Sequence, residues 1–415
     1  MGQPRFVGLW RNRDFVKLWA GETISVFGSM VTATALPFTA VLVLHATPMQ
    51  MSLLRAADLV PGLLIGVAAG VWVDRLPCRP QLIAVDLGRA LLLVSIPLAA
   101  FAGVLRIEQL YVVGFLTGIL SMVFAVAFRS YLPTLVRRED LVEGNSKLSA
   151  SAAVAEVGAF GLSGWLVQIF TAPLAILLDA LSFVASAAFV AMIRAPEAGP
   201  RAPAQRSMWI ESAEGLRFVV SHPVLRVLAG CTMLLKFAFY VFSTVFMLFV
   251  TRELGFAPGV LGMIFAVGGV SSLLGALIAR RATTRWGVGP TLIGGLGLTG
   301  LGILLVPLAP GATLVGALLL IAQQLVEDGA ATVYDIIEVS LRQALAPPAM
   351  LGRINASMRM AGLAAMLLGA LVGGVLGESI GLRMTLVVAA TSPFIAAVWL
   401  ACSPVRRLME LPNEP

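Results

Sequence analysis

Six carboxylates stand inside long apolar stretches of this 415-residue chain, where an ionised side chain is expensive: Glu22, Asp58, Glu156, Asp179, Glu327 and Asp328. Burial favours the protonated form of a carboxyl group, and contact with water favours the ionised form. Such a group can hold a proton in one environment, release it in another, and compete for a cationic molecule. These residues predict proton exchange, and we expect no enzymatic activity.

Two of these acids also have structural explanations. Arg55 precedes Asp58 by three residues on the same helical face, so the two side chains could form an ion pair that has no part in proton exchange. For Asp179 a hydrogen bond between neighbouring helices is the better explanation.

Residues 325–343 carry an unusually acidic helical surface. At about 100° per residue, the side chains fall into two adjacent stripes, Glu327–Tyr334–Glu338 and Asp328–Asp335–Arg342. Such a surface must face water, a partner helix or a cation rather than lipid. Glu338 and Arg342 stand four residues apart and are expected to pair locally, which leaves the other acids for a cavity.

One lysine, Lys236, lies in an apolar, aromatic-rich stretch and could neutralise an acid or receive an anionic substrate group. The aromatic residues near it could wall an apolar pocket, although about half of them are expected to face lipid. The predicted substrate-cavity residues are Lys236, Phe239, Tyr240, Tyr334 and Asp335.

No cofactor or metal is predicted. The three cysteines, Cys78, Cys231 and Cys402, are too far apart for disulfide or zinc spacing. The glycines of GGLGLTGLG (294–302) lack the Lys-Ser/Thr of a phosphate-binding loop, which argues against an ATP-driven pump.

The elements that must position these residues are membrane-spanning helices. The chain is 59% hydrophobic and 12% charged, far from the composition of a soluble domain. Because a span needs about 20 apolar residues, we predict twelve helices, at 16–44, 51–73, 81–104, 108–132, 146–169, 172–193, 224–250, 258–279, 289–308, 312–341, 354–377 and 382–402. The net charge of +7 is scattered over short loops, so no nucleic-acid partner is expected.

A polar linker divides the chain into an N-terminal six-helix bundle (1–193), a cytoplasmic linker with an amphipathic segment (194–223) and a C-terminal six-helix bundle (224–415). Lys and Arg gather in the loops of one side, which the positive-inside rule assigns to the cytoplasm together with both termini. The first helix is expected to remain uncleaved.

An internal repeat appears when the halves are shifted by 210 residues. Pro48 then aligns with Pro258, Arg75 with Arg285, and the triplet 97–99 with 307–309. Parallel six-helix repeats of this kind are typical of major facilitator transporters.

The stretch GVWVDRLPCRPQ (70–81) resembles the loop motif between helices 2 and 3 of the major facilitator superfamily, with matches at Gly70, Asp74, Arg75 and Arg79. Pro77 replaces the usual glycine. Residues 128–146 and 338–357 resemble exporters of the macrolide-efflux and enterobactin-exporter type, with matches that include Arg129, Gly352 and Arg353. The resemblance implies that these seven residues form a cytoplasmic gate.

The resemblance also implies a cavity lined by the first and tenth helices, which makes Glu22 and Glu327 the stronger proton-coupling candidates, followed by Asp328, Glu156 and Asp58. The glycine-proline element usual in antiporters of this superfamily lacks its proline here, in VGAFGLSGWL (157–166).

We expect an all-α transporter in the bacterial plasma membrane, a monomer surrounded by lipid. It is expected to export an amphipathic drug, natural product or modified peptide in exchange for protons. An uptake carrier or facilitator of the same fold, or a non-transporting receptor or scaffold, are the alternatives.

Overall fold

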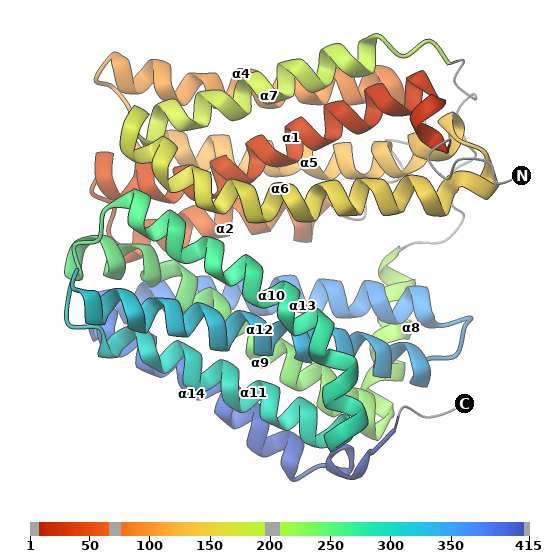
Figure 1. Cartoon of the computed structure of the whole chain (residues 1–415), viewed down its shortest axis with the longest axis vertical. Coiled ribbons are helices and arrows are strands. Elements are labelled where there is room, and N and C mark those ends of the chain that lie inside the picture. The colour runs from red at the N-terminus through yellow and green to blue at the C-terminus, as the bar shows by residue number, and fades with distance from the viewer. Residues whose placement is uncertain (1–7, 66–75, 196–207, 411–415) are drawn as a thin grey trace, which may run out of the picture. The chain divides into compact units, whose positions relative to one another are not determined.

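The computed structural model describes residues 8–65, 76–195 and 208–410, and all regular structure in these ranges is helical (Figure 1). The chain forms two compact units. Unit 1 comprises Met1–His45 and Val60–Gln205, and unit 2 comprises Ala46–Leu59 and Arg206–Pro415. The main boundary therefore falls inside the predicted linker.

In the described ranges, unit 1 contains five long helices: α1 (Arg13–Phe38), α4 (Cys78–Phe101), α5 (Ile107–Leu135), α6 (Leu141–Phe170) and α7 (Ala172–Ala191). A π-helical turn, η2 (Thr39–Val43), extends α1, and α2 (Pro48–Ile65) is divided between the units. Short 3-10 turns, η1 (Leu9–Arg11) and η3 (Arg138–Asp140), precede α1 and α6. Helix α7 packs against both α1 and α4, so residues from these three helices can meet in the interior of unit 1.

Unit 2 contains α8 (Met208–Ser221), α9 (Pro223–Leu248), α10 (Pro258–Trp286), α11 (Val288–Leu305), α12 (Leu314–Leu345), α13 (Leu351–Ser379) and α14 (Leu382–Ala401). Short turns follow three of them: η4 (Phe249–Glu253), η5 (Val306–Leu308) and η6 (Pro404–Arg407). The amphipathic segment predicted in the linker forms α8. It packs on α13, where the Glu214 carboxylate pairs with Arg353 at 2.7 Å.

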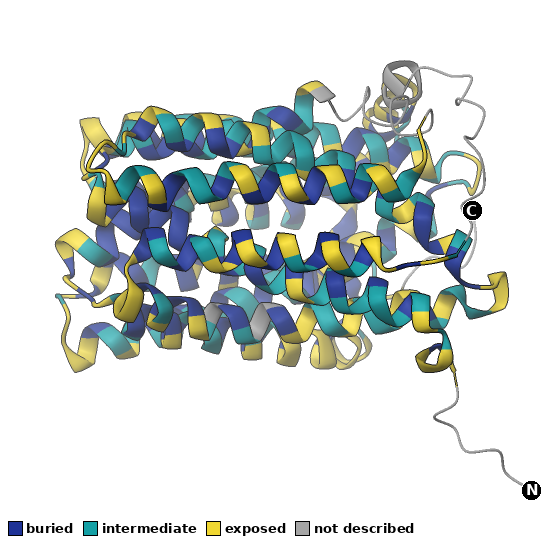
Figure 2. Cartoon of the chain, turned by 90° about the horizontal axis from the view of Figure 1, so that it is seen from above, coloured by how far each residue is buried: buried dark blue, intermediate teal, exposed yellow. Residues whose placement is uncertain are grey.

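The membrane-spanning prediction is confirmed. Ten helices in the described ranges are long and apolar enough to cross a bilayer. The other two predicted segments also form helices, α2 and α6. Exposed positions recur along the helices in Figure 2, and many of them are large apolar residues such as Leu91 and Leu277. An apolar exposed surface is what helices that face lipid require.

The predicted repeat is present at the level of helices. Helix α1 spans residues 13–38 and α9 spans 223–248, and the π-helical turns η2 and η4 that follow them keep the same shift of 210 residues. The packing also repeats, because α1 contacts α6 and α7 as α9 contacts α13 and α14. Because the backbones of the two units correspond, the side chains at equivalent positions can be compared directly.

Candidate functional site

A cluster of charged side chains lies in the interior of unit 1. Asp86 and Arg89 stand one turn apart on α4 and form an ion pair, and both are buried. Arg89 also interacts electrostatically with Glu22 on α1 and Asp179 on α7. We call these four residues the unit 1 charge cluster. It brings together three helices that are far apart in the sequence.

Aromatic rings hold the Arg89 guanidinium in place. Its central carbon lies 4.3 Å from the ring centroid of Phe124 on α5 and 4.1 Å from that of Phe183 on α7. Cation–π contacts of this kind are strongest where the cation is removed from water. The guanidinium is therefore fixed at the centre of the cluster, within reach of carboxylates on three helices.

The hydrogen bonding of the cluster is incomplete. Within the described part of the chain, Glu22 Oε2, Asp86 Oδ2 and Arg89 Nε have no hydrogen-bond partner. Ser186 lies beside Asp86 but outside good hydrogen-bond geometry. Buried polar atoms normally find partners, and those that do not are often found where a proton or other ligand acts.

Helix packing brings Asp179 into the cluster. Its carboxylate accepts a hydrogen bond from Ser182 at 3.1 Å on its own helix, and Thr32 of α1 lies close by. Gly28 of α1 makes this approach possible, because a Cβ at that position would lie 2.6 Å from Asp179 Oδ1. Asp179 therefore contacts the neighbouring helix α1, and it also interacts with Arg89 of α4.

The charges of the cluster do not balance. Three carboxylates share one guanidinium, so one acid can be compensated and two cannot. An uncompensated charge at membrane depth costs a few kcal/mol or more. The cluster can lower this cost by taking up protons or another cation.

Sequence patterns identified Glu22 and Asp179 but not Asp86 and Arg89. A signal was present, because an Asp and an Arg three residues apart inside an apolar segment are both ionisable groups at membrane depth. Under the 210-residue shift, the four cluster positions correspond to Thr232, Leu296, Thr299 and Ala389. The charge cluster is therefore a property of unit 1 alone.

An apolar pocket of about 880 Å³ adjoins the cluster. It lies between α1, α6 and α7 and is lined by residues that include Trp19, Phe27, Val31, Val154 and Leu181. Gly28 and Ser182, which contact Asp179, also belong to its wall. The polar contacts of its lining include that of the Trp19 indole N–H, which donates to Ser151 at 2.7 Å. A pocket of this kind suits a largely apolar molecule with a few polar groups.

In unit 2, the acids of α12 point to different neighbours. Glu327 is buried and accepts a hydrogen bond from Gln323 at 2.6 Å. It lies against α11 at Gly302, where a Cβ would be 2.7 Å from the Glu327 Cβ. Asp328 instead lies beside Gly268 of α10. The two neighbouring acids therefore face two different helix interfaces.

Further along α12, the charges are better balanced. Glu338 and Arg342 form the predicted local pair at 3.7 Å, which confirms that prediction. Lys236 of α9 interacts electrostatically with both Asp335 and Glu338. Two acids and two cations thus compensate one another, in contrast to the unit 1 charge cluster.

The other predicted cavity residues occupy different settings. Tyr334 is fully buried in the core of unit 2, where its hydroxyl lies 3.3 Å from that of Thr232, and its role in a substrate cavity stays a prediction. Phe239 is exposed, and Tyr240 interacts electrostatically with Arg55 and Asp58. Arg55 lies near Asp58, but no ion pair joins them among the described residues.

Several predicted gate residues lie outside the described ranges, namely Gly70, Asp74 and Arg75. Arg79 donates to the backbone carbonyls of Val190 and Ala191 at the end of α7. Arg129 and Gly352 are exposed, and Arg353 binds Glu214. Glu156 belongs to α6, and its side chain is outside what the structure describes. The gate role of all seven residues stays a prediction.

No group of three His, Cys, Asp or Glu side chains within the described ranges is arranged to hold a metal ion.

Comparison with known proteins identifies the fold family. The model of the Major Facilitator Superfamily matches residues 18–322 and 228–414. Among solved structures, a bacterial homologue of the iron transporter ferroportin in the inward-facing state has a TM-score of 0.75 at 17% identity, over 94% of this chain and 98% of that one. The nucleoside transporter NupG has a TM-score of 0.73 at 14% identity, over 94% and 98% of the two chains.

Relatives in sequence are transporters as well. The MFS-type transporter YfiS of Bacillus subtilis is 27% identical over 92% of this chain and 91% of its own length. The multidrug efflux pump Tap of Mycolicibacterium fortuitum is 26% identical over 97% of both chains. Macrolide efflux protein A of Streptococcus pyogenes is 24% identical over 45% of this chain and 46% of its own length. The chain is a multi-pass membrane transport protein rather than an enzyme, it is similar to drug-efflux transporters, and it belongs to the Major Facilitator Superfamily.

Proposed function

We propose that this protein exports an amphipathic drug or natural product, in exchange for protons, across the bacterial plasma membrane. The observation that carries the proposal is the unit 1 charge cluster, in which three carboxylates on three helices share the single guanidinium of Arg89. The distribution of Lys and Arg along the chain supports a cytoplasmic position for both termini.

The cluster has the properties that a proton-binding site needs. Arg89 compensates Asp86 directly, so Glu22 and Asp179 are the acids left to take up protons when the site is closed to water. When alternating access brings water to the site, hydration stabilises the ionised carboxylates and the protons leave. Glu327, buried and hydrogen-bonded to Gln323, is the corresponding candidate in unit 2.

The adjoining apolar pocket supports an amphipathic substrate. Its wall combines aromatic and aliphatic side chains with the polar pair formed by Trp19 and Ser151. Because Gly28 and Ser182 belong both to this wall and to the surroundings of Asp179, a bound molecule would change the hydration of the cluster. Similarity to the efflux pump Tap supports export rather than uptake.

The test is accumulation of ethidium, a permanent cation, in proteoliposomes with an acidic lumen and no membrane potential. A gradient of one pH unit then supports about a tenfold accumulation of substrate per proton exchanged. The wild type is expected to accumulate substrate only with the gradient. The double variant with Glu22→Gln and Asp179→Asn keeps the Asp86–Arg89 pair. Proteoliposomes that contain it should reach the same internal substrate concentration with and without the gradient.

Glu108→Gln is the matched control, because Glu108 is an exposed acid at the start of α5 and should transport like the wild type. Glu327→Gln is measured separately, so that the roles of the two units are distinguished. Wild-type transport that ignores the pH gradient would contradict proton coupling, and gradient-driven accumulation by the double variant would exclude the unit 1 charge cluster as the coupling site.

A further inference from the structure

We propose that Ser186 of α7 is a positioning residue of the proton-binding site, whose hydroxyl donates to Asp86 when Arg89 turns to the other acids of the unit 1 charge cluster. This inference rests on the proposed function and adds a residue to it. Ser186 keeps its own proton throughout. Its part is to hold the charge of Asp86 while the neighbouring acids release their protons.

One stripe of α7 makes the contacts of this helix with the cluster. Its members are three or four residues apart on one helical face: Asp179, Ser182, Phe183 and Ser186. Ser182 donates to Asp179, and the Phe183 ring lies against the Arg89 guanidinium. Ser186 is only 1% exposed, yet its hydroxyl has no hydrogen-bond partner among the described residues. Since an unpaired buried hydroxyl costs free energy, this one is available for a bond that forms at another stage of transport.

The acceptor for this hydroxyl lies next to it on α4. Asp86 is buried and bonds Arg89 through Oδ1, and its Oδ2 has no partner in the described part of the chain. Ser186 interacts with this carboxylate but lies outside good hydrogen-bond geometry. Because a hydroxyl hydrogen rotates freely, a small movement of the serine side chain is enough to complete the bond.

Gly21 of α1 leaves the room that this movement needs. A Cβ at position 21 would lie 3.3 Å from Ser186 Oγ and 3.3 Å from Phe189 Cβ, which is tighter than ordinary van der Waals contact. A larger residue there would press on the serine. Helix α1 thus contributes a gap at the same level as the acid Glu22, the next residue along the chain.

The repeat supplies an internal comparison. Under the shift of 210 residues, the positions of the glycine, the acid and the serine correspond to Cys231, Leu296 and Ala396 in unit 2. These three residues belong to the hydrophobic core of unit 2, where the Cys231 thiol donates to the Ala396 carbonyl. The gap, the acceptor and the donor therefore occur together in unit 1 and are replaced together in unit 2.

The surrounding charges indicate when the bond forms. The described charged side chains that act on this place are Glu22 of α1, Asp86 and Arg89 of α4, and Asp179 of α7. Lys17, nearer the start of α1, is paired with Asp14. While Glu22 and Asp179 are protonated, Arg89 serves Asp86 alone. Once they ionise, three carboxylates compete for one guanidinium, and a donor from the serine compensates Asp86 for its lost share. Hydrogen bonds to ionised groups are about twice as strong as neutral ones, so Ser186 eases proton release.

The test is the pH profile of ethidium accumulation in proteoliposomes, with both compartments varied together at a constant gradient of one unit. Ser186→Ala is expected to move the profile to higher pH by about one unit, as loss of one hydrogen bond to a charged group implies. The KM for ethidium should stay within twofold of the wild type. Ser186→Thr keeps the hydroxyl, and Gly21 leaves space for its methyl group, so it should restore the wild-type profile.

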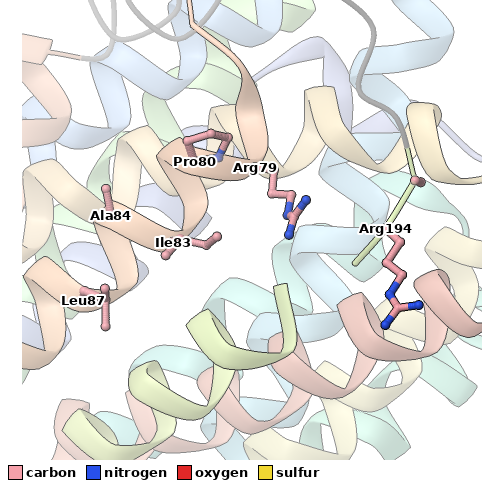
Figure 3. Close-up of a pocket in the computed structure, with 7 residues that line it drawn as sticks. Arg79, Pro80, Ile83, Ala84, Leu87 and Arg194 are labelled. Atoms are coloured by element: carbon pink, nitrogen blue, oxygen red, sulfur yellow. The ribbon is translucent and has the colours of Figure 1, made fainter. Parts of the chain in front are cut away.

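Two controls are matched to this variant. Ser146→Ala removes an exposed serine of α6 that donates to the Val142 carbonyl, and it should keep the wild-type profile. Arg194→Gln removes a charge on the segment that follows α7, outside the cluster (Figure 3), and should do the same. A shift in either control as large as that of Ser186→Ala would overturn the proposal.

A second measurement separates positioning from a structural role. In the double variant with Glu22→Gln and Asp179→Asn, Arg89 has no other acid of the cluster to serve. Adding Ser186→Ala to it should therefore leave the rate of downhill ethidium transport unchanged, whereas a serine needed only for packing would slow transport in both backgrounds.

Two further results would overturn the inference while the proposed function stands, provided that wild-type transport follows the gradient. One is an identical pH profile for the wild type and Ser186→Ala. The other is an equal shift in Ser186→Thr, which would show that side-chain volume rather than the hydroxyl matters. Wild-type transport that ignores the gradient would contradict the proposed function and this inference together.

Discussion

At the residue scale, the central feature is a single arginine that serves three acids. Asp86 bonds it directly, while Glu22 and Asp179 approach it from α1 and α7. Removing one partner of a buried ion pair is more damaging than removing both, because the remaining charge loses its compensation. Substitutions of the four cluster residues should therefore lower the stability of the protein by unequal amounts.

Arg89→Gln is expected to be the most destabilising single change in the cluster, by about 3–5 kcal/mol, because it leaves three acids without a cation at membrane depth. Adding Asp86→Asn to it should restore part of the loss. Thermal unfolding in detergent measures both effects. A double variant that is less stable than Arg89→Gln would contradict the compensation argument.

At the element scale, close contact between α1 and α7 places Asp179 in the cluster. Gly28 allows this contact, since a side chain there would collide with Asp179 and Ser182. The apolar pocket shares this interface. Helix spacing thus controls the charge cluster and the pocket together.

Gly28→Ala is expected to cost about 1–3 kcal/mol through overpacking, because α1 and α7 must separate to admit the methyl group. It should also weaken ethidium binding, since the same helices form the pocket. Gly158→Ala on α6 is the control, because nothing lies within 4 Å of its added Cβ, although Gly158 also lines the pocket. Equal effects of the two substitutions on stability would argue against a special role of the α1–α7 contact.

At the scale of the whole molecule, the two units share one helical frame and differ in the charges that it carries. Helices α1 and α9 match under a shift of 210 residues, yet Glu22 of α1 corresponds to Thr232 of α9, which lies against Tyr334. Equivalent positions thus hold an ionisable site in one unit and a neutral hydrogen bond in the other. A repeated fold can therefore carry ionisable groups in one half and a neutral, packed core at the equivalent place in the other half.

Because the number of predicted spans is even, both termini are expected on one side, and the distribution of basic residues predicts that this side is cytoplasmic. Cys402 follows α14 and is exposed, so a membrane-impermeant maleimide is expected to label it in inverted vesicles and not in right-side-out ones. The background is Cys78→Ser with Cys231→Ser. A second variant lacks Cys402 and carries Arg106→Cys in the loop before α5. The maleimide should label it in right-side-out vesicles and not in inverted ones. Labelling of both sites from one side would refute the predicted topology.

Composition and apolar segment length predicted twelve membrane-spanning helices, and ten helices of the described ranges have the required length and polarity, because a bilayer sets both properties of a span. The 210-residue register and the local pair Glu338–Arg342 also followed from spacing along the chain, since periodicity tells which residues share a face of one helix. Periodicity does not tell which neighbouring helix that face meets. Only the tertiary structure therefore decided that Asp86 and Arg89 join Glu22 and Asp179, that Tyr334 lies in the core, and that Glu327 and Asp328 face different helices.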